Sequence, residues 1–121
     1  KFAWIVNSED GLDEISPYGK TNVIQLKDNK ISEITIDPKE LNINADGFDN
    51  LLGDDAKFNA NKMMDIFKGE DNDFSKAVCL NAAAGLIVAE KHSKFIDAYE
   101  DARKHILTGK TFEHLNKIRD V

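Results

Sequence analysis

The sequence predicts an α/β fold: the C-terminal portion of a larger α/β domain, with one buried strand and a β-hairpin followed by a helical run. Three observations support this prediction. Residues 2–6 are continuously apolar, residues 22–36 show two-residue alternation, and after Gly53 the apolar residues recur with the 3.6-residue period of a helix. At 121 residues, the chain has the length of one domain or of part of one.

The first strand is predicted over residues 2–6, because an uninterrupted apolar run suits a strand that is covered on both faces in a parallel sheet. A second strand is predicted over residues 22–27 and a third over residues 30–36. Asp28 and Asn29 form a plausible tight turn between them, so the two strands make a hairpin. Asp37 followed by Pro38 resembles the start of a helix, which predicts a short helix there.

Four segments after residue 53 predict helices or their ends. Ala60, Met63, Met64 and Phe67 share one helical face and are expected in the core, with Gly69 as the stop signal. Residues 75–91 are apolar nearly all round, which predicts a central helix. A third helix has one apolar stripe and ends near Gly109, and Thr111 is expected to cap a last helix. The stripe of the third helix is Phe95, Tyr99, Ala102 and Ile106; the last helix presents Phe112, Leu115 and Ile118.

These elements do not complete a fold by themselves. A buried parallel strand needs parallel neighbours, and an all-apolar helix needs partners on every side. The chain also opens directly into a strand. We therefore expect residues 1–121 to be a piece of a larger protein, with the rest of the sheet upstream.

Composition excludes several classes of function. The formal net charge is −6, and only Arg103 and Arg119 are arginines, which argues against nucleic-acid binding. The longest apolar stretch, residues 77–89, is too short for a membrane span, and nothing resembles a signal peptide. The single cysteine, Cys79, cannot form an internal disulfide, which fits a cytoplasmic location.

The loop after the first strand, residues 7–21, is the place where chemistry is expected. Ligands of open α/β sheets bind beyond the carboxyl ends of the parallel strands. This loop carries four acidic residues, and oxygen ligands of this kind suit Mg²⁺. The chain has four other adjacent acidic pairs besides Asp13-Glu14, and most are expected to be solvated surface. The acidic residues of the loop are Glu9, Asp10, Asp13 and Glu14.

The run Asp10-Gly11-Leu12-Asp13-Glu14-Ile15-Ser16, followed by Gly19 and Thr21, resembles the acidic signature of the anthranilate phosphoribosyltransferases. The similarity continues through Asn59-Ala60 and through Leu80-Asn81-Ala82-Ala83, and it covers essentially the whole chain. The Gly-Leu-Asp-Glu core is the specific part of the signature.

The resemblance implies a reaction and a cofactor. In that family, the amine of anthranilate attacks C1 of the ribose in 5-phosphoribosyl diphosphate and expels pyrophosphate, in tryptophan biosynthesis. Asp13 and Glu14 match the acidic pair that holds Mg²⁺ on the diphosphate. The metal offsets charge on the leaving group, and no catalytic side chain is implied within this piece. The resemblance also implies an upstream helical domain through which the intact protein forms a homodimer.

Two departures from the family pattern affect loop geometry. The family usually has His-Gly where this chain has Asn7-Ser8, and two glycines where it has Leu52-Gly53. The glycine-rich diphosphate loop and the anthranilate-contacting residues of the family lie upstream of Lys1, so the piece is expected to be inactive alone.

The remaining polar candidates favour structural roles. The three histidines have no standard metal spacing and are expected at the surface, and Cys79 is expected to be a small buried hydrophobe. Asn81 lies in the apolar helix, where a buried amide needs hydrogen-bond partners; backbone groups are favoured over substrate. The histidines are His92, His105 and His114.

Three other functions remain open. A pyrimidine-nucleoside phosphorylase-like relative shares the fold group but lacks the paired metal carboxylates, so Asp13 and Glu14 count against it. A non-catalytic, nucleic-acid-binding relative is opposed by the net charge of −6. For an independent interaction module the sequence gives no positive sign.

Overall fold

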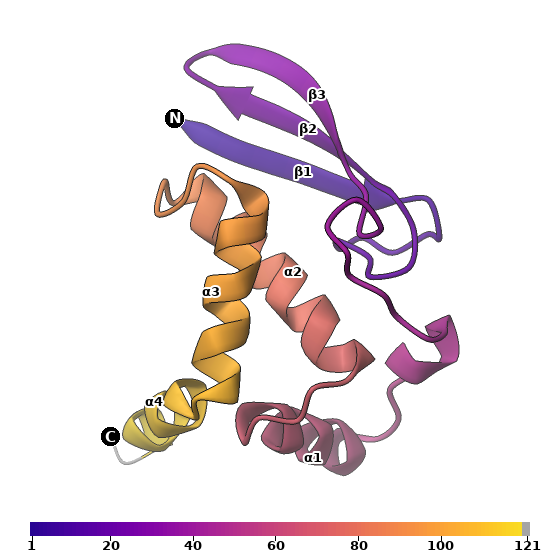
Figure 1. The fold of residues 1–121 in the computed structure, drawn as a ribbon, viewed down its shortest axis with the longest axis vertical. Coiled ribbons are helices and arrows are strands. Elements are labelled where there is room, and N and C mark those ends of the chain that lie inside the picture. The colour runs from indigo at the N-terminus through magenta and orange to yellow at the C-terminus, as the bar shows by residue number, and fades with distance from the viewer. Residues whose placement is uncertain (120–121) are drawn as a thin grey trace.

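The structure of this protein, a computed structural model, describes residues 1–119 (Figure 1). Strands occupy the first third of the chain and helices the rest, as the sequence predicts. The elements are β1 (Phe2–Ser8), β2 (Thr21–Lys27), β3 (Lys30–Ile36), the 3-10 helix η1 (Phe48–Leu51), α1 (Ala56–Phe67), α2 (Asp73–Val88), α3 (Phe95–Leu107) and α4 (Lys110–Arg119).

The hairpin forms as predicted. β2 pairs antiparallel with β3, and the residues between them, Asp28 and Asn29, both have positive φ (51° and 62°). That conformation at two consecutive positions is the turn whose twist matches paired strands, and Asp and Asn adopt it more readily than most residues. The two turn residues therefore set the register of the hairpin.

The prediction that the first strand is buried in a parallel sheet is wrong for the described residues. β1 pairs antiparallel with β2 in the strand order β1-β2-β3. Its side chains alternate between a covered and an exposed face, and Ile5 is 72% exposed. A continuous apolar run does not distinguish these cases, because Ala3 and Ile5 fill the outward positions that usually hold polar residues.

The short helix expected at Asp37-Pro38 is also absent. Residues 38–42 form a turn, in which the Ile43 N–H donates to the Pro38 carbonyl at 2.8 Å. Asn42 has a φ of 57°, a left-handed conformation that ends any helical course after one turn. The sequence signal for a helix start is therefore present, but the turn does not continue into a helix.

The helices lie below the sheet, with α2 and α3 side by side and α1 and α4 at the end away from the strands (Figure 1). The helix stops predicted at Gly69 and Gly109 are confirmed by positive φ values of 103° and 76°. α2 begins two residues earlier than predicted, because Asn72 and Ser75 form a reciprocal capping box. Thr111 lies within α4 and is not its cap.

The core joins the inner face of the sheet to α2 and α3. Val23, Leu80 and Ala98 are fully covered, and Cys79 is buried as predicted. Trp4 packs on this face, stacked on Phe95 with ring centroids 6.2 Å apart. These contacts hold the sheet on the N-terminal end of α3 and fix how the loop after β1 approaches α2.

Two predictions about burial need correction. Met63 is 52% exposed and Ala60 is exposed, so in the described residues the buried side chain of α1 is Ile66. α2 is central but not enclosed, since Val78 is 40% exposed. Together with Phe67, Val78 lines apolar grooves beside α2. None of the helices in residues 1–119 is long and apolar enough to cross a membrane.

Candidate functional site

The acidic loop, residues 9–20, connects β1 to β2 and closes on its own backbone. The Glu9 N–H donates to the Lys20 carbonyl and the Ser8 N–H to the Leu12 carbonyl, both at 2.9 Å. The Gly11 N–H donates to the Ser8 carbonyl at 3.1 Å. These backbone hydrogen bonds therefore hold the loop in a compact shape at the carboxyl end of β1.

The side chain of Asp10, although exposed, holds the loop together through hydrogen bonds. Its carboxylate accepts hydrogen bonds from the Ser8 and Ser16 hydroxyls, and from the Leu12 N–H at 3.4 Å. Partial burial alone would raise the pKa of Asp10, but these hydrogen bonds outweigh it and hold the pKa below its usual value. A Cβ atom at Gly19 would lie 3.4 Å from the same carboxylate, so this side of Asp10 is closely covered. The carboxylate of Asp10 therefore stabilises the folded loop.

Ser16 links the middle of the loop to its end. Its hydroxyl accepts the N–H groups of Tyr18 (3.0 Å) and Gly19 (3.2 Å), and its own N–H donates to the Thr21 hydroxyl at 3.1 Å. Ser16 and Thr21 are both fully buried. The signature residues Asp10, Ser16, Gly19 and Thr21 thus belong to one hydrogen-bonded network.

Asp13 and Glu14 lie outside that network. Both side chains are exposed, and within residues 1–119 neither carboxylate makes a hydrogen bond or an ion pair with another side chain or the backbone. Glu9 is likewise exposed, and three carboxylates of the loop, including this adjacent pair, make no hydrogen bond or ion pair with the rest of the described chain. An adjacent pair suits Mg²⁺, which takes one or two protein carboxylates and completes its shell with water and substrate phosphates. No group of three or more His, Cys, Asp or Glu side chains that could hold a metal ion occurs in the described part of the chain.

Two contacts fix the loop to α2. The Asn81 amide bonds both backbone groups of Ile15: Oδ1 accepts its N–H at 2.9 Å, and Nδ2 donates to its carbonyl at 3.1 Å. The Tyr18 hydroxyl donates to the Asp73 carboxylate at 3.1 Å. The prediction that Asn81 bonds backbone groups is confirmed.

Asp73 is a residue that the sequence analysis did not single out. It is 4% exposed and collects four donors: the Tyr18 hydroxyl, the Asp46 N–H, the Asn50 amide and the Lys76 ammonium, the last three each at 2.9 Å. Burial opposes its charge, but these donors hold the pKa of the carboxyl well below its usual range. The sequence signal was available, since an acidic residue just after Asn72 suits the first turn of a helix.

Two of the three histidines are exposed, as the sequence predicts, and the third is only partly so. His105 and His114 are exposed and His92 is half-buried. His92 Nε2 lies 3.0 Å from the Asp101 carboxylate, and His105 Nδ1 lies 3.4 Å from it. These contacts join the segment before α3 to the surface of that helix. They involve residues that are far in sequence from the acidic loop.

Comparisons with known proteins agree with this description. Residues 1–112 match the family described as glycosyl transferase family, a/b domain. Over 121 residues, the chain is 78% identical to the anthranilate phosphoribosyltransferase of Pelagibacter ubique strain HTCC1062; the match covers all of this chain and 37% of that protein. The resemblance predicted from the acidic signature is confirmed.

Solved structures show the same fold. The anthranilate phosphoribosyltransferase of Thermus thermophilus matches with a TM-score of 0.86 at 24% identity, over 96% of this chain and 34% of that one. The Saccharomyces cerevisiae enzyme in complex with PRPP and Mg matches with a TM-score of 0.81 at 22% identity, over 93% of this chain and 33% of that one. The chain thus spans about a third of the length of the relatives it matches.

Proposed function

Since this chain belongs to the glycosyl transferase family, whose α/β domain it matches over residues 1–112, we propose that it is part of an anthranilate phosphoribosyltransferase. The whole protein would transfer phosphoribose from 5-phosphoribosyl diphosphate to the amine of anthranilate and release pyrophosphate, in tryptophan biosynthesis. The 78% identity to the Pelagibacter ubique enzyme supports this activity. A cytoplasmic location and a homodimer formed through an upstream helical domain are parts of the same proposal.

Within that enzyme, we assign Asp13 and Glu14 of the acidic loop the role of binding Mg²⁺ on the diphosphate. The acidic signature matches Asp13 and Glu14, and one observation supports the assignment: the Asp10 carboxylate accepts hydrogen bonds within the loop, whereas Asp13 and Glu14 present unpaired carboxylates to solvent. Glu9 is exposed as well, but it lies outside the matched pair. The related yeast enzyme was solved in complex with PRPP and Mg together, which supports a magnesium–diphosphate ligand for the proposed site.

In this proposal, the residues of this chain bind the metal and keep the loop that carries its ligands in one conformation. Asp13 and Glu14 would hold the metal, and Asp10 would keep the loop between Ser8 and Ser16 in one shape. When bound, Mg²⁺ offsets the negative charge that develops on the departing diphosphate. No side-chain nucleophile of this chain is required by the proposal, because the attacking amine belongs to anthranilate.

The proposal is tested by Asp13→Asn and Glu14→Gln in the full-length protein. Each change is expected to lower kcat/KM by at least about tenfold, about 1.4 kcal/mol of transition-state stabilisation. Melting temperature without ligand should stay the same or rise slightly, because a repulsive pair of carboxylates is lost. Excess Mg²⁺ should partly restore the affinity for 5-phosphoribosyl diphosphate.

Glu9→Gln is the matched control, since Glu9 is an exposed carboxylate of the same loop outside the proposed pair. It removes the same charge and should leave kcat/KM within about twofold, the range expected of a surface change. If the Asp13 and Glu14 variants instead melt at lower temperature while activity per folded molecule holds, the two residues serve the turn and the magnesium role is removed from this loop.

A further inference from the structure

Asn81 lies in the middle of α2 and makes three hydrogen bonds through one amide. Besides the two bonds to Ile15, its Nδ2 donates to the Ala77 carbonyl at 2.9 Å, one turn back along the helix. The orientation of the amide is determined by these partners. With Oδ1 and Nδ2 exchanged, oxygen would face two carbonyl oxygens and nitrogen would face an N–H.

The peptide that Asn81 holds is the one that follows the proposed metal pair. The Ile15 N–H belongs to the peptide bond between Glu14 and Ile15, and the Ile15 side chain is 1% exposed. Ile15 is therefore fixed by both backbone groups and by its buried side chain. Glu14 extends to solvent from a peptide that cannot rotate without breaking these contacts.

The helix that carries Asn81 is itself well anchored, and the loop is attached to it at a second point. α2 is capped at its start by Asn72 and Ser75, and the Tyr18–Asp73 bond fixes the same loop a second time. Asp73 and Asn81 are eight residues apart on α2, about 12 Å along the helix axis. Two attachments at that separation prevent the loop from pivoting about either one.

We propose that Asn81 is a positioning residue for the metal carboxylates: through Ile15, it sets the place and direction of Glu14 and, one residue earlier, of Asp13. This inference rests on the magnesium role proposed above. Asn81 touches neither metal nor substrate in this arrangement and acts only through the backbone. A carboxamide suits the task because it offers one acceptor and two donors, which a leucine of similar size lacks.

The chain contains a matched control for this contact. The Asn59 amide makes the same pair of bonds to one residue: Oδ1 accepts the Asp54 N–H at 3.0 Å and Nδ2 donates to the Asp54 carbonyl at 2.9 Å. These bonds cap the approach to α1, outside the acidic loop. Asn59→Leu thus removes an equivalent backbone clamp without touching the proposed metal pair.

The test is Mn²⁺ binding, followed by electron paramagnetic resonance, to the full-length protein with 5-phosphoribosyl diphosphate and no anthranilate. Mn²⁺ replaces Mg²⁺ as a visible probe. Asn81→Leu and Asn81→Ala are expected to raise the Mn²⁺ dissociation constant by at least about tenfold, the usual effect of removing a group that orients a metal ligand. Asn59→Leu should leave that constant within about twofold of the unchanged protein, since it leaves the carboxylates in place.

Binding is measured on folded protein isolated by size-exclusion chromatography. The positioning role is overturned if either folded Asn81 variant binds Mn²⁺ as tightly as the unchanged protein. It is also overturned if neither variant yields folded protein, because Asn81 would then be a residue for stability. Asp13→Asn and Glu14→Gln in the same assay separate the two proposals: if they do not weaken Mn²⁺ binding, the metal role fails, and if only the Asn81 variants bind normally, the positioning role alone fails.

Discussion

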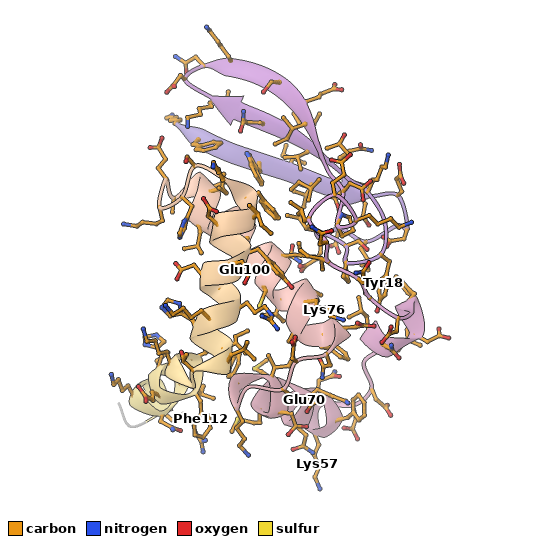
Figure 2. All side chains as sticks on the ribbon, viewed as in Figure 1. Tyr18, Lys57, Glu70, Lys76, Glu100 and Phe112 are labelled. Carbon is orange, nitrogen blue, oxygen red and sulfur yellow. The ribbon has the colours of Figure 1, made fainter. Side chains whose placement is uncertain are left out.

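The Tyr18 hydroxyl donates a 3.1 Å hydrogen bond to the buried carboxylate of Asp73, joining the end of the acidic loop to the first turn of α2. Figure 2 shows Tyr18 on the loop side of this junction and Lys76 on the helix side. Burial and the adjacent carboxylate raise the pKa of Tyr18 to about 12. The phenol therefore stays a neutral donor, and Asp73 stays a charged acceptor, through the neutral pH range.

This junction predicts how stability depends on acid. Because the pKa of Asp73 is lower in the folded protein than its ordinary 3.8, its charged form contributes stability above about pH 4, and this contribution is lost as pH falls below that value. Asp73→Asn should lower the free energy of unfolding at pH 7 by about 1–3 kcal/mol, the usual cost of disrupting buried hydrogen bonds.

Thermal unfolding of the full-length protein at pH 7, 5, 4 and 3 checks this prediction. The melting-temperature difference between the unchanged protein and Asp73→Asn should be constant from pH 7 to 5 and should shrink towards pH 3. A difference that stays constant down to pH 3 would show that Asp73 titrates alike in the folded and unfolded states.

A second prediction concerns Gly53, which lies against the Asn59 amide. A Cβ atom at position 53 would lie 2.8 Å from Asn59 Oδ1, closer than real Cβ contacts allow. Gly53→Ala should therefore displace the exposed Asn59 amide from Asp54 and cost about 1 kcal/mol of stability, the net contribution of a typical hydrogen bond. Gly47→Ala is the control, since a Cβ there meets no atom within 4 Å.

The origin of the Gly53 effect is tested by a double-mutant cycle with Asn59→Ala, measured by urea unfolding. If the contact is the cause, the double variant should be more stable than the sum of the two single changes predicts. Strict additivity would place the cost of Gly53→Ala elsewhere, in the backbone of residues 52–54.

A third prediction concerns residues 1–121 as a separate polypeptide. We expect no turnover of anthranilate and 5-phosphoribosyl diphosphate with Mg²⁺, because catalysis requires groups held in position around the substrate and this chain spans about a third of its relatives. The measurement compares product formation with a protein-free blank and with the full-length protein. Product above the blank would show that this piece holds a complete active site.

Local signals predicted the parts of the fold that local physics decides. Asp28 and Asn29 fixed the hairpin because both tolerate positive φ, and the stripe from Phe95 to Ile106 fixed α3. The same kind of local signal wrongly predicted a helix at Pro38, because Asn42 adopts a left-handed conformation that ends the turn. It also misjudged β1, since an apolar run does not reveal which face is covered.

In the candidate site, the family resemblance selected Asp13 and Glu14 as the metal pair, but the sequence did not predict the structural role of Asp10. All three are acidic residues of one loop, and only the folded loop brings Ser8 and Ser16 onto Asp10. Asp73 was missed for a related reason. Its partner Tyr18 lies 55 positions away in sequence, and no local pattern encodes such a contact.

The exposed side of β1 has a practical consequence for handling this polypeptide. In residues 1–119, β1 pairs on one edge only, and the outer sheet face beside it carries Ile5, Ile24 and Ile31, which are 39% to 75% exposed. A flat apolar strand with free backbone groups is a template for edge-to-edge aggregation. Preparations of the isolated piece should therefore self-associate as concentration rises, and Ile5→Lys, a charge on that edge strand, is the change that would keep it dispersed.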